Sequence, residues 1–138
     1  MGTRTRGGRG GWNVSENEIG DRIVASALAV HTALGPGLLE SAYEQCLAYE
    51  LRQAGLAVGR QEVLPLVYRD AVVDAGYRLD LLVEGQVVIE LQAVEALTPS
   101  HLAQILSDLK LGGFKLGDLL NFNVVRMKDG IRRVANGL

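Results

Sequence analysis

Two carboxylates and an amide lie in a segment that has the pattern of two paired strands. Asp80 belongs to the first apolar run, Glu90 and Gln92 belong to the second, and a turn near Gly85 separates them. Alternation places Glu90 and Gln92 on one strand face, and a register pairing residue 80 with residue 90 would bring the two carboxylates together. Magnesium and manganese bind such oxygens along with waters and phosphate oxygens. The segment therefore predicts a divalent-metal site, and the alternative is two polar residues on a solvated sheet face.

Two helices are expected ahead of these strands. Ser15 and Glu18 have the spacing of a capping box. The helix that they open is expected to run to about Ala33, because Gly35-Pro36-Gly37 cannot continue it. A second helix is expected from about Leu38 to Ala54, where apolar residues recur at the helical period. These helices would pack against the sheet that carries the carboxylates.

Three strands are expected after the helices, over residues 58–68, 71–83 and 87–94, as an antiparallel meander. Pro65 removes a hydrogen-bond donor from the first of them. That strand is therefore expected at the edge of the sheet or with a bulge.

The remainder of the chain predicts a helix, a strand and a hairpin. Thr98-Pro99 is a helix start, and this helix should reach about Leu111. A strand is expected over residues 115–122 and a short terminal hairpin over residues 124–134. The chain is therefore interpreted as one domain over residues 15–138, preceded by a flexible tail rich in glycine and arginine over residues 1–14.

Composition narrows the class of protein. The chain has 138 residues, of which 48% are hydrophobic, and this suits one compact domain. Its net charge of −2 argues weakly against nucleic acid as a partner. No apolar run approaches the length that a membrane span needs, so no membrane partner is expected. The single cysteine, Cys46, is expected to be a small buried hydrophobe, and a cytoplasmic location is expected.

Several segments resemble the blocks of one known family. Gly37-Leu-Leu-Glu40-Ser-Ala-Tyr43 is similar to the signature of the GxxExxY proteins, a branch of the PD-(D/E)XK nuclease-like superfamily. The resemblance extends over about residues 15 to 136, through Tyr77-Arg-Leu-Asp80, Val88-Ile-Glu90, His101-x-x-Gln104 and Leu120-Asn-Phe-Asn123. It implies an α/β (α+β) fold with the αβββαβ core of restriction endonucleases. The additional N-terminal helix and C-terminal hairpin come from the pattern described above.

The resemblance also implies roles for individual residues. Glu40, Asp80 and Glu90 would be catalytic, and Asp80 and Glu90 would hold magnesium or manganese. Active nucleases of this superfamily carry a lysine two residues beyond the second ligand, where this chain has Gln92. Glutamine has no positive charge and cannot act as a base near neutral pH. Loss of one preorganised electrostatic group typically costs about 10²–10³-fold in rate, so the site is interpreted as degenerate.

Further pocket-lining residues are expected on the helix after the sheet. His101, Gln104 and Asp108 fall on one helical face, and in the resembling family a tyrosine often takes the place of Asp108. His101 has an alternative role as a structural hydrogen-bonding group. Tyr43 would either line the pocket or fix the loop before its helix. The pocket has thus gained a carboxylate and lost a lysine.

Two functions remain open from the sequence. The favoured hypothesis is a catalytically inactive protein that binds a small-molecule ligand of unknown identity or assembles as a homo-oligomer. The apolar first helix and the edges of the terminal hairpin support self-association. The alternative is a divalent-metal-dependent nuclease that cleaves DNA or RNA phosphodiesters. Gln92 and Asp108 favour the first hypothesis, and Asp80 with Glu90 favours the second.

Overall fold

Two helices open the structure, a computed structural model that describes residues 15–137 of the chain. Helix α1 spans Glu16–Leu34 and helix α2 spans Glu40–Gln53. The capping box at Ser15 and Glu18 is confirmed, since each side chain accepts a hydrogen bond from the other residue's main chain. The predicted tail over residues 1–14 lies outside the described residues.

The centre of the fold is a five-stranded mixed sheet with strand order β1-β4-β5-β6-β7. Its strands are β1 (Val58–Val63), β4 (Arg78–Val83), β5 (Val87–Gln92), β6 (Leu116–Asn121) and β7 (Ile131–Ala135). Strands β5 and β6 are parallel and the other pairs are antiparallel. Helix α3 (Pro99–Gly112) makes the crossover between the parallel strands. This is the α+β architecture that the sequence predicts.

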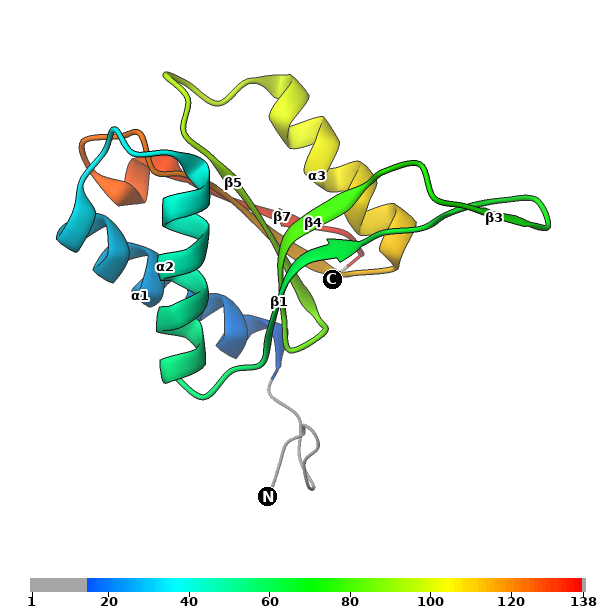
Figure 1. Cartoon of the computed structure of the whole chain (residues 1–138), viewed down its shortest axis with the longest axis horizontal. Helices are drawn as coiled ribbons and strands as arrows, with labels where there is room; N and C mark the ends of the chain where they lie inside the picture. The colour runs from blue at the N-terminus through cyan, green and yellow to red at the C-terminus, as the bar shows by residue number, and fades with distance from the viewer. Residues whose placement is uncertain (1–14, 138) are drawn as a thin grey trace.

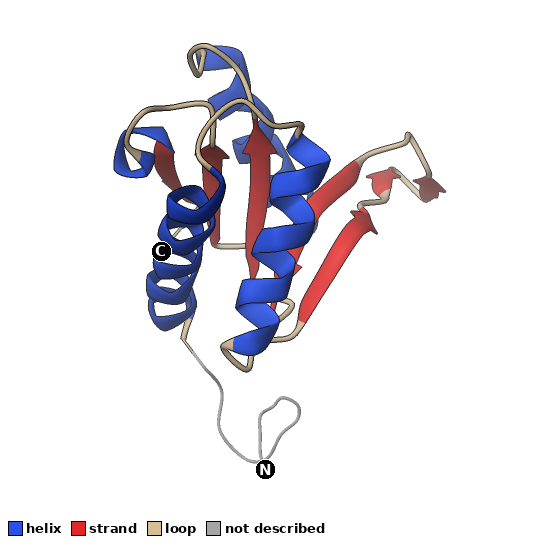
Figure 2. Ribbon diagram, turned by 60° about the vertical axis from the view of Figure 1, so that its left-hand side comes forward, coloured by secondary structure: helices blue, strands red, loops and turns tan. Residues whose placement is uncertain are grey.

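The helices cover the two faces of the sheet (Figures 1 and 2). Helices α1 and α2 pack with Leu81, Ile89 and Leu91 in one buried cluster. On the other face Val88 packs with Leu109 of α3. Burial of these apolar side chains holds the layers together at roughly 1.5–3 kcal/mol for each large side chain. Glu90 alternates with Ile89 and Leu91, so it belongs to the α3 face.

A two-stranded ribbon, here called the arm, leaves the main sheet between β1 and β4. It consists of β2 (Leu66–Tyr68) and β3 (Ala71–Val73), which pair with each other as a separate sheet. The arm projects from the body of the molecule (Figure 1). The prediction of continuous strands over residues 58–68 and 71–83 was therefore wrong. Pro65 interrupts the first because it cannot donate to a ladder, and Gly76, at φ +83°, turns the second.

The end of the chain also differs from the prediction. The expected hairpin over residues 124–134 is instead a 3-10 turn, η2 (Met127–Gly130), followed by the single strand β7, which pairs with β6. Every residue of β6 is buried, and pairing with β7 satisfies its second edge. Gly130 approaches the carbonyl of Asn121 so closely that a side chain there would clash. The close approach requires glycine at this turn.

The prediction of a buried Cys46 was wrong, since this residue is exposed. Helix α2 buries the stripe that contains Tyr43, Leu47 and Leu51, and Cys46 points to a different side of the helix. Among residues 15–137, no helix combines the length and apolar character needed to cross a bilayer.

Candidate functional site

The two carboxylates of the predicted metal site come together through the pairing of β4 with β5. Leu81 pairs with Ile89 and Leu82 with Val88, and Asp80 and Glu90 are the next residues on each strand. The Asp80 Oδ2 atom also accepts a hydrogen bond of 2.8 Å from the main-chain N–H of Leu91. The charge of Asp80 contributes to the raised pKa of Glu90, so the two side chains lie near each other, although the ladder of paired residues ends one residue short of them.

Glu90 has the most unusual environment of these carboxylates. Its Oε2 atom is buried and has no hydrogen-bond partner among the described residues. Burial raises the pKa of Glu90 to about 9, and the negative charges of Asp80 and Asp108 add to the effect. The carboxyl group therefore keeps a proton at neutral pH. A buried carboxyl in this state can donate a hydrogen bond or exchange its proton for a cation.

Asp80 and Asp108 are perturbed in the same direction. Burial raises the pKa of Asp80, and the charges of Glu44 and Glu40 raise it further. Burial raises the pKa of Asp108 as well, although Gln104 opposes this by donating to its Oδ1 at 3.0 Å. The charge of Asp108 raises the pKa of Glu90, and that of Asp80 raises the pKa of Asp108, so Asp108 of α3 lies near the carboxylates of β4 and β5.

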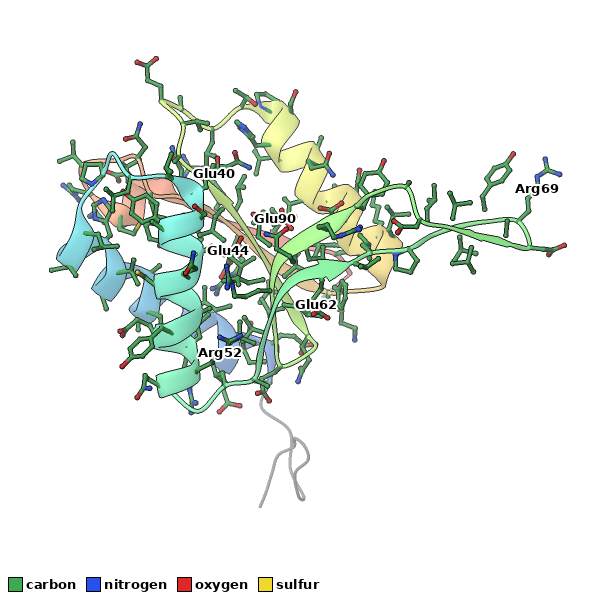
Figure 3. The ribbon with its side chains drawn as sticks, viewed as in Figure 1. Glu40, Glu44, Arg52, Glu62, Arg69 and Glu90 are labelled. Carbon is green, nitrogen blue, oxygen red and sulfur yellow. The ribbon has the colours of Figure 1, made fainter. Side chains whose placement is uncertain are left out.

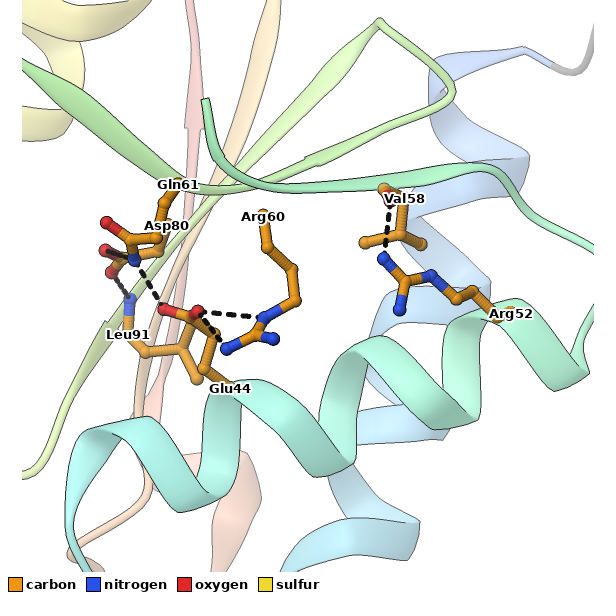
Figure 4. Close-up of polar contacts among 7 residues, drawn as sticks. All are labelled: Glu44, Arg52, Val58, Arg60, Gln61, Asp80 and Leu91. Carbon is orange, nitrogen blue, oxygen red and sulfur yellow. Dashed lines mark hydrogen bonds and ion pairs between the residues drawn. The ribbon is translucent and has the colours of Figure 1, made fainter. Parts of the chain in front are cut away.

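A hydrogen-bonded group of side chains lies next to Asp80 and was not predicted from the sequence (Figure 4). It consists of Glu44, Arg60 and Gln61. Arg60 donates to the Glu44 Oε2 atom at 3.1 Å. Gln61 donates through Nε2 to the Glu44 Oε1 atom at 2.7 Å and lies 3.4 Å from the Asp80 Oδ1 atom. Gln61 thus joins the buried carboxylate of α2 to the carboxylate of β4. The positive charge of Arg60 is committed to Glu44.

Gln61 reaches this position through a distortion of β1. Its φ of +52° is in the left-handed region that few side chains adopt, and the residues on either side of it keep the register with β4. A one-turn spacing from Glu40 could have indicated Glu44. No local signal marks Arg60 or Gln61, because their side chains bind Glu44 of α2 and Asp80 of β4, which are distant in the sequence.

Glu40 and Tyr43 hold the start of α2 in place. The Glu40 Oε2 atom accepts a hydrogen bond of 3.3 Å from the N–H of Ala93, just after β5. The Tyr43 hydroxyl donates to the Gly35 carbonyl at 2.6 Å and accepts from the Leu38 N–H at 3.1 Å. The Tyr43 ring is fully buried and stacks on Phe122. Tyr43 therefore fixes the loop between the helices, whereas Glu40 lies at the exposed rim (Figure 3).

His101 caps the N-terminus of helix α3. Its Nδ1 atom accepts a hydrogen bond of 2.9 Å from the N–H of Thr98, and the Thr98 hydroxyl accepts from the His101 N–H. The two residues form a capping box with histidine in the place usually taken by glutamate. Of the three residues expected on this helical face, Gln104 and Asp108 are hydrogen-bonded to each other, whereas His101 takes part in the helix cap.

Positive charge is scarce around the carboxylates. Within residues 15–137, no arginine or lysine forms an ion pair with Asp80, Glu90 or Asp108. Arg78, which shares a strand with Asp80, pairs with Asp74 at 3.5 Å instead. Gln92 is half-buried beyond Glu90 on the same strand. This cluster therefore combines three carboxyl groups of raised pKa with neutral amides.

The donor set allows a test of whether a divalent cation suits this pocket. No cluster of three or more acidic, histidine or cysteine side chains in the described part of the chain has a metal-binding arrangement. Two paired carboxylates with an unpartnered Oε2 on Glu90 nevertheless fit magnesium, which takes one or two protein carboxylates and completes its shell with waters. Asp80 and Glu90 are the residues that would hold it, and Glu90 must first release its proton.

Comparison with known proteins agrees with this fold. A search of curated proteins and a search of solved structures each found no match. A family model described as the PD-(D/E)XK nuclease superfamily matches residues 17–134. This superfamily typically uses divalent metals. The match includes every helix and every strand of the main sheet except the first residue of α1 and the last residue of β7. The chain therefore belongs to the PD-(D/E)XK nuclease superfamily.

Proposed function

We propose that this chain is a catalytically inactive member of the superfamily, of the GxxExxY branch, that acts as a ligand-binding or self-assembling oligomeric protein. The observation that carries the proposal is the neutral Gln92 beside Glu90 and the absence of a paired cation for Asp80, Glu90 or Asp108 among the described residues. Hydrolysis of a phosphodiester develops negative charge. A pocket that adds only carboxylates and amides has no positive side chain to stabilise that charge.

The protonation of Glu90 supports the same proposal. At neutral pH its carboxyl group is uncharged, because its pKa is raised to about 9. A lysine at position 92 would favour the ionised form by direct charge attraction. With glutamine there, the pocket presents an uncharged carboxyl donor and amide groups, which suit a neutral polar ligand of small size better than a phosphate.

A nuclease is the second candidate, and the paired Asp80 and Glu90 favour it. A bound divalent cation would supply polarisation of the phosphate. The chain itself would supply Asp80 and Glu90 as ligands, with Gln61 holding Asp80 in position. Gln92 could orient a water molecule through its amide.

A nuclease assay with manganese separates the two candidates. We expect the native chain and its Asp80→Ala variant to leave DNA and RNA equally intact. We expect Gln92→Lys to gain cleavage, which would indicate that charge at position 92 is the missing element. Lys110 lies exposed on α3, so Lys110→Gln is a control for the effect of surface charge. Cleavage by the native chain that Asp80→Ala abolishes would establish the nuclease instead.

A further inference from the structure

The arm is apolar, exposed and narrow. Val67 and Val72 pair across the ribbon on one of its faces and are 64% and 72% exposed. Tyr68, on the opposite face, is 61% exposed. A single two-stranded ribbon is marginally stable in water, and its free edges can pair with other chains. A protrusion of this kind is expected to be covered in the functional state of the protein.

An apolar groove lies on the other side of the molecule, between the C-terminal half of α1 and the middle of α2. It has a volume of about 390 Å³. Its lining is mostly apolar and includes Ala29, Ala33, Cys46 and Tyr49. Tyr49 is 60% exposed there, so the groove offers an aromatic ring to an incoming side chain.

Both surfaces are mostly apolar, and each carries a charged side chain, of opposite sign, that could pair across a contact. Arg69 at the tip of the arm stacks on Tyr68 and has no ion pair among residues 15–137. Glu50 lines the groove and likewise has no ion pair in the described part of the chain. In a contact between the two surfaces, Tyr68 could pack on Tyr49 and Arg69 could pair with Glu50.

One copy of the chain cannot make this contact with itself. The arm extends to one side of the sheet, and α1 and α2 lie at the other side (Figures 1 and 3). The strands of the arm have three residues each, a length of about 10 Å. The arm can therefore enter only the groove of a second copy.

We propose that the arm of one copy docks in the α1–α2 groove of the next, so that copies add head to tail. This inference rests on the self-assembly part of the proposed function and identifies the surfaces that carry it. A contact between two different surfaces repeats from copy to copy and produces a ring or a filament. Nucleic acid is a poorer partner for the arm, because Asp70 beside Arg69 cancels the attraction of the tip to a phosphate backbone.

Paired variants test the contact. Val67→Asp places a charge on the apolar arm, and Ala29→Glu places one in the apolar groove. Both residues are exposed, so neither change is expected to unfold the chain. Each alone should raise the dissociation constant about tenfold or more. Val125→Asp is the matched control, since Val125 is 91% exposed and belongs to neither surface. Multi-angle light scattering over a concentration series gives the mass of each sample relative to the 14.8 kDa chain.

An equimolar mixture of Val67→Asp and Ala29→Glu is the decisive sample. The mixture contains one intact arm and one intact groove, so it should form dimers that do not grow further. If copies instead paired arm with arm, Ala29→Glu, whose arm is intact, would assemble by itself at native affinity, and this result would overturn the proposal. Assembly of Val67→Asp alone at native affinity would also overturn it. Circular dichroism establishes that each variant is folded, and Val72→Asp serves as a second arm variant.

Cys46 reports on the groove directly, because it is the single cysteine of the chain and lines the groove. Its reaction with a maleimide should slow as the native protein is concentrated and should stay fast in Val67→Asp. An oligomer with a fully reactive Cys46 would overturn docking in the groove while leaving self-assembly intact. A native chain that remains monomeric at every concentration would overturn self-assembly as well.

Charge reversal tests the register of the contact. Arg69→Glu should weaken assembly about two- to fivefold, as expected for a pair at an exposed rim. Adding Glu50→Arg to the same chain should restore the affinity. Failure of the double variant to recover would overturn the placement of Arg69 beside Glu50.

Discussion

Two carboxylates with buried oxygen atoms lie on the adjacent strands β5 and β6, and their surroundings differ in charge. Asp118 is fully buried on the α1 face, where Arg133 of β7 binds it with two hydrogen bonds of 2.8 and 3.0 Å. Glu90 lies on the α3 face, and its buried Oε2 atom has no partner among the described residues. The surroundings supply a cation for Asp118 and further carboxyl groups for Glu90.

The difference shows how the surroundings of a carboxylate decide its use. A buried charge is costly unless it is paired, and an unpaired group neutralises itself instead. Asp118 is paired, so it can hold β6 to β7 as part of the framework. Glu90 keeps its proton, with a pKa raised to about 9, and is therefore available to a ligand or a cation. Two of the variants below change one side of this comparison each, and a third changes a carboxylate, Glu44, whose ion pair is intermediate in burial.

Removing the partner of Asp118 should have the largest effect. Arg133→Ala leaves a buried carboxylate without its cation, and this should lower the free energy of unfolding by about 3–5 kcal/mol. Arg132→Ala is the control, because Arg132 is exposed and binds only main-chain carbonyls. Urea denaturation at pH 7 measures both. Equal effects of the two variants would mean that the ion pair has no special weight in the fold.

The Glu90 side of the comparison predicts a dependence on pH. The folded chain holds a proton on Glu90 up to about pH 9, whereas the unfolded chain releases it near the ordinary value of 4.5. The folded state thus binds more protons in this window, and its stability falls as pH rises from about 4.5 to about 9.

Glu90→Gln should remove most of this fall, since glutamine keeps the shape of the side chain and does not titrate. Urea denaturation at pH 5, 7 and 9 compares the variant with the native chain. The exposed Glu95 provides the control variant Glu95→Gln, which should keep the native pH dependence. A Glu90→Gln variant that loses stability with pH as steeply as the native chain would contradict a protonated Glu90.

The half-buried ion pair of the pocket should give the smallest effect that can be measured. Arg60→Ala removes the cation from Glu44, which is 7% exposed. We expect a loss of about 1–2 kcal/mol, because Gln61 still donates to the Glu44 carboxylate. Arg78→Ala, which removes an exposed ion pair with Asp74, should leave the stability unchanged within error. Equal losses for the two variants would contradict the graded role of burial.

Local patterns predicted much of the fold. The capping box at Ser15, the glycine stop at Gly35 and the proline start at Pro99 depend on neighbouring residues alone, and the structure has all three. The strand errors have a different origin. The pattern of residues 58–83 does not show that Pro65 and Gly76 divert the middle of this segment into the arm.

The candidate site also has some features that follow from neighbouring residues and others that follow from tertiary packing. Asp80, Glu90 and Gln92 could be placed from the sequence, because a hairpin register and strand alternation are local properties. Glu44, Arg60 and Gln61 could not, since they meet only when α2 and β1 pack against β4. The commitment of Arg60 to Glu44 is likewise a result of tertiary packing.

The sequence by itself determined the three helices, the strands that carry Asp80 and Glu90, and the neutral residue at position 92. Only the tertiary structure decided the charge state of Glu90, because that depends on burial and on Asp108 from a distant helix. It also decided that Asp118 has a cation and Glu90 has none among the described residues. The physical reason is that hydrogen-bond patterns are set by neighbours in the chain, whereas desolvation and pairing of charge are set by neighbours in space.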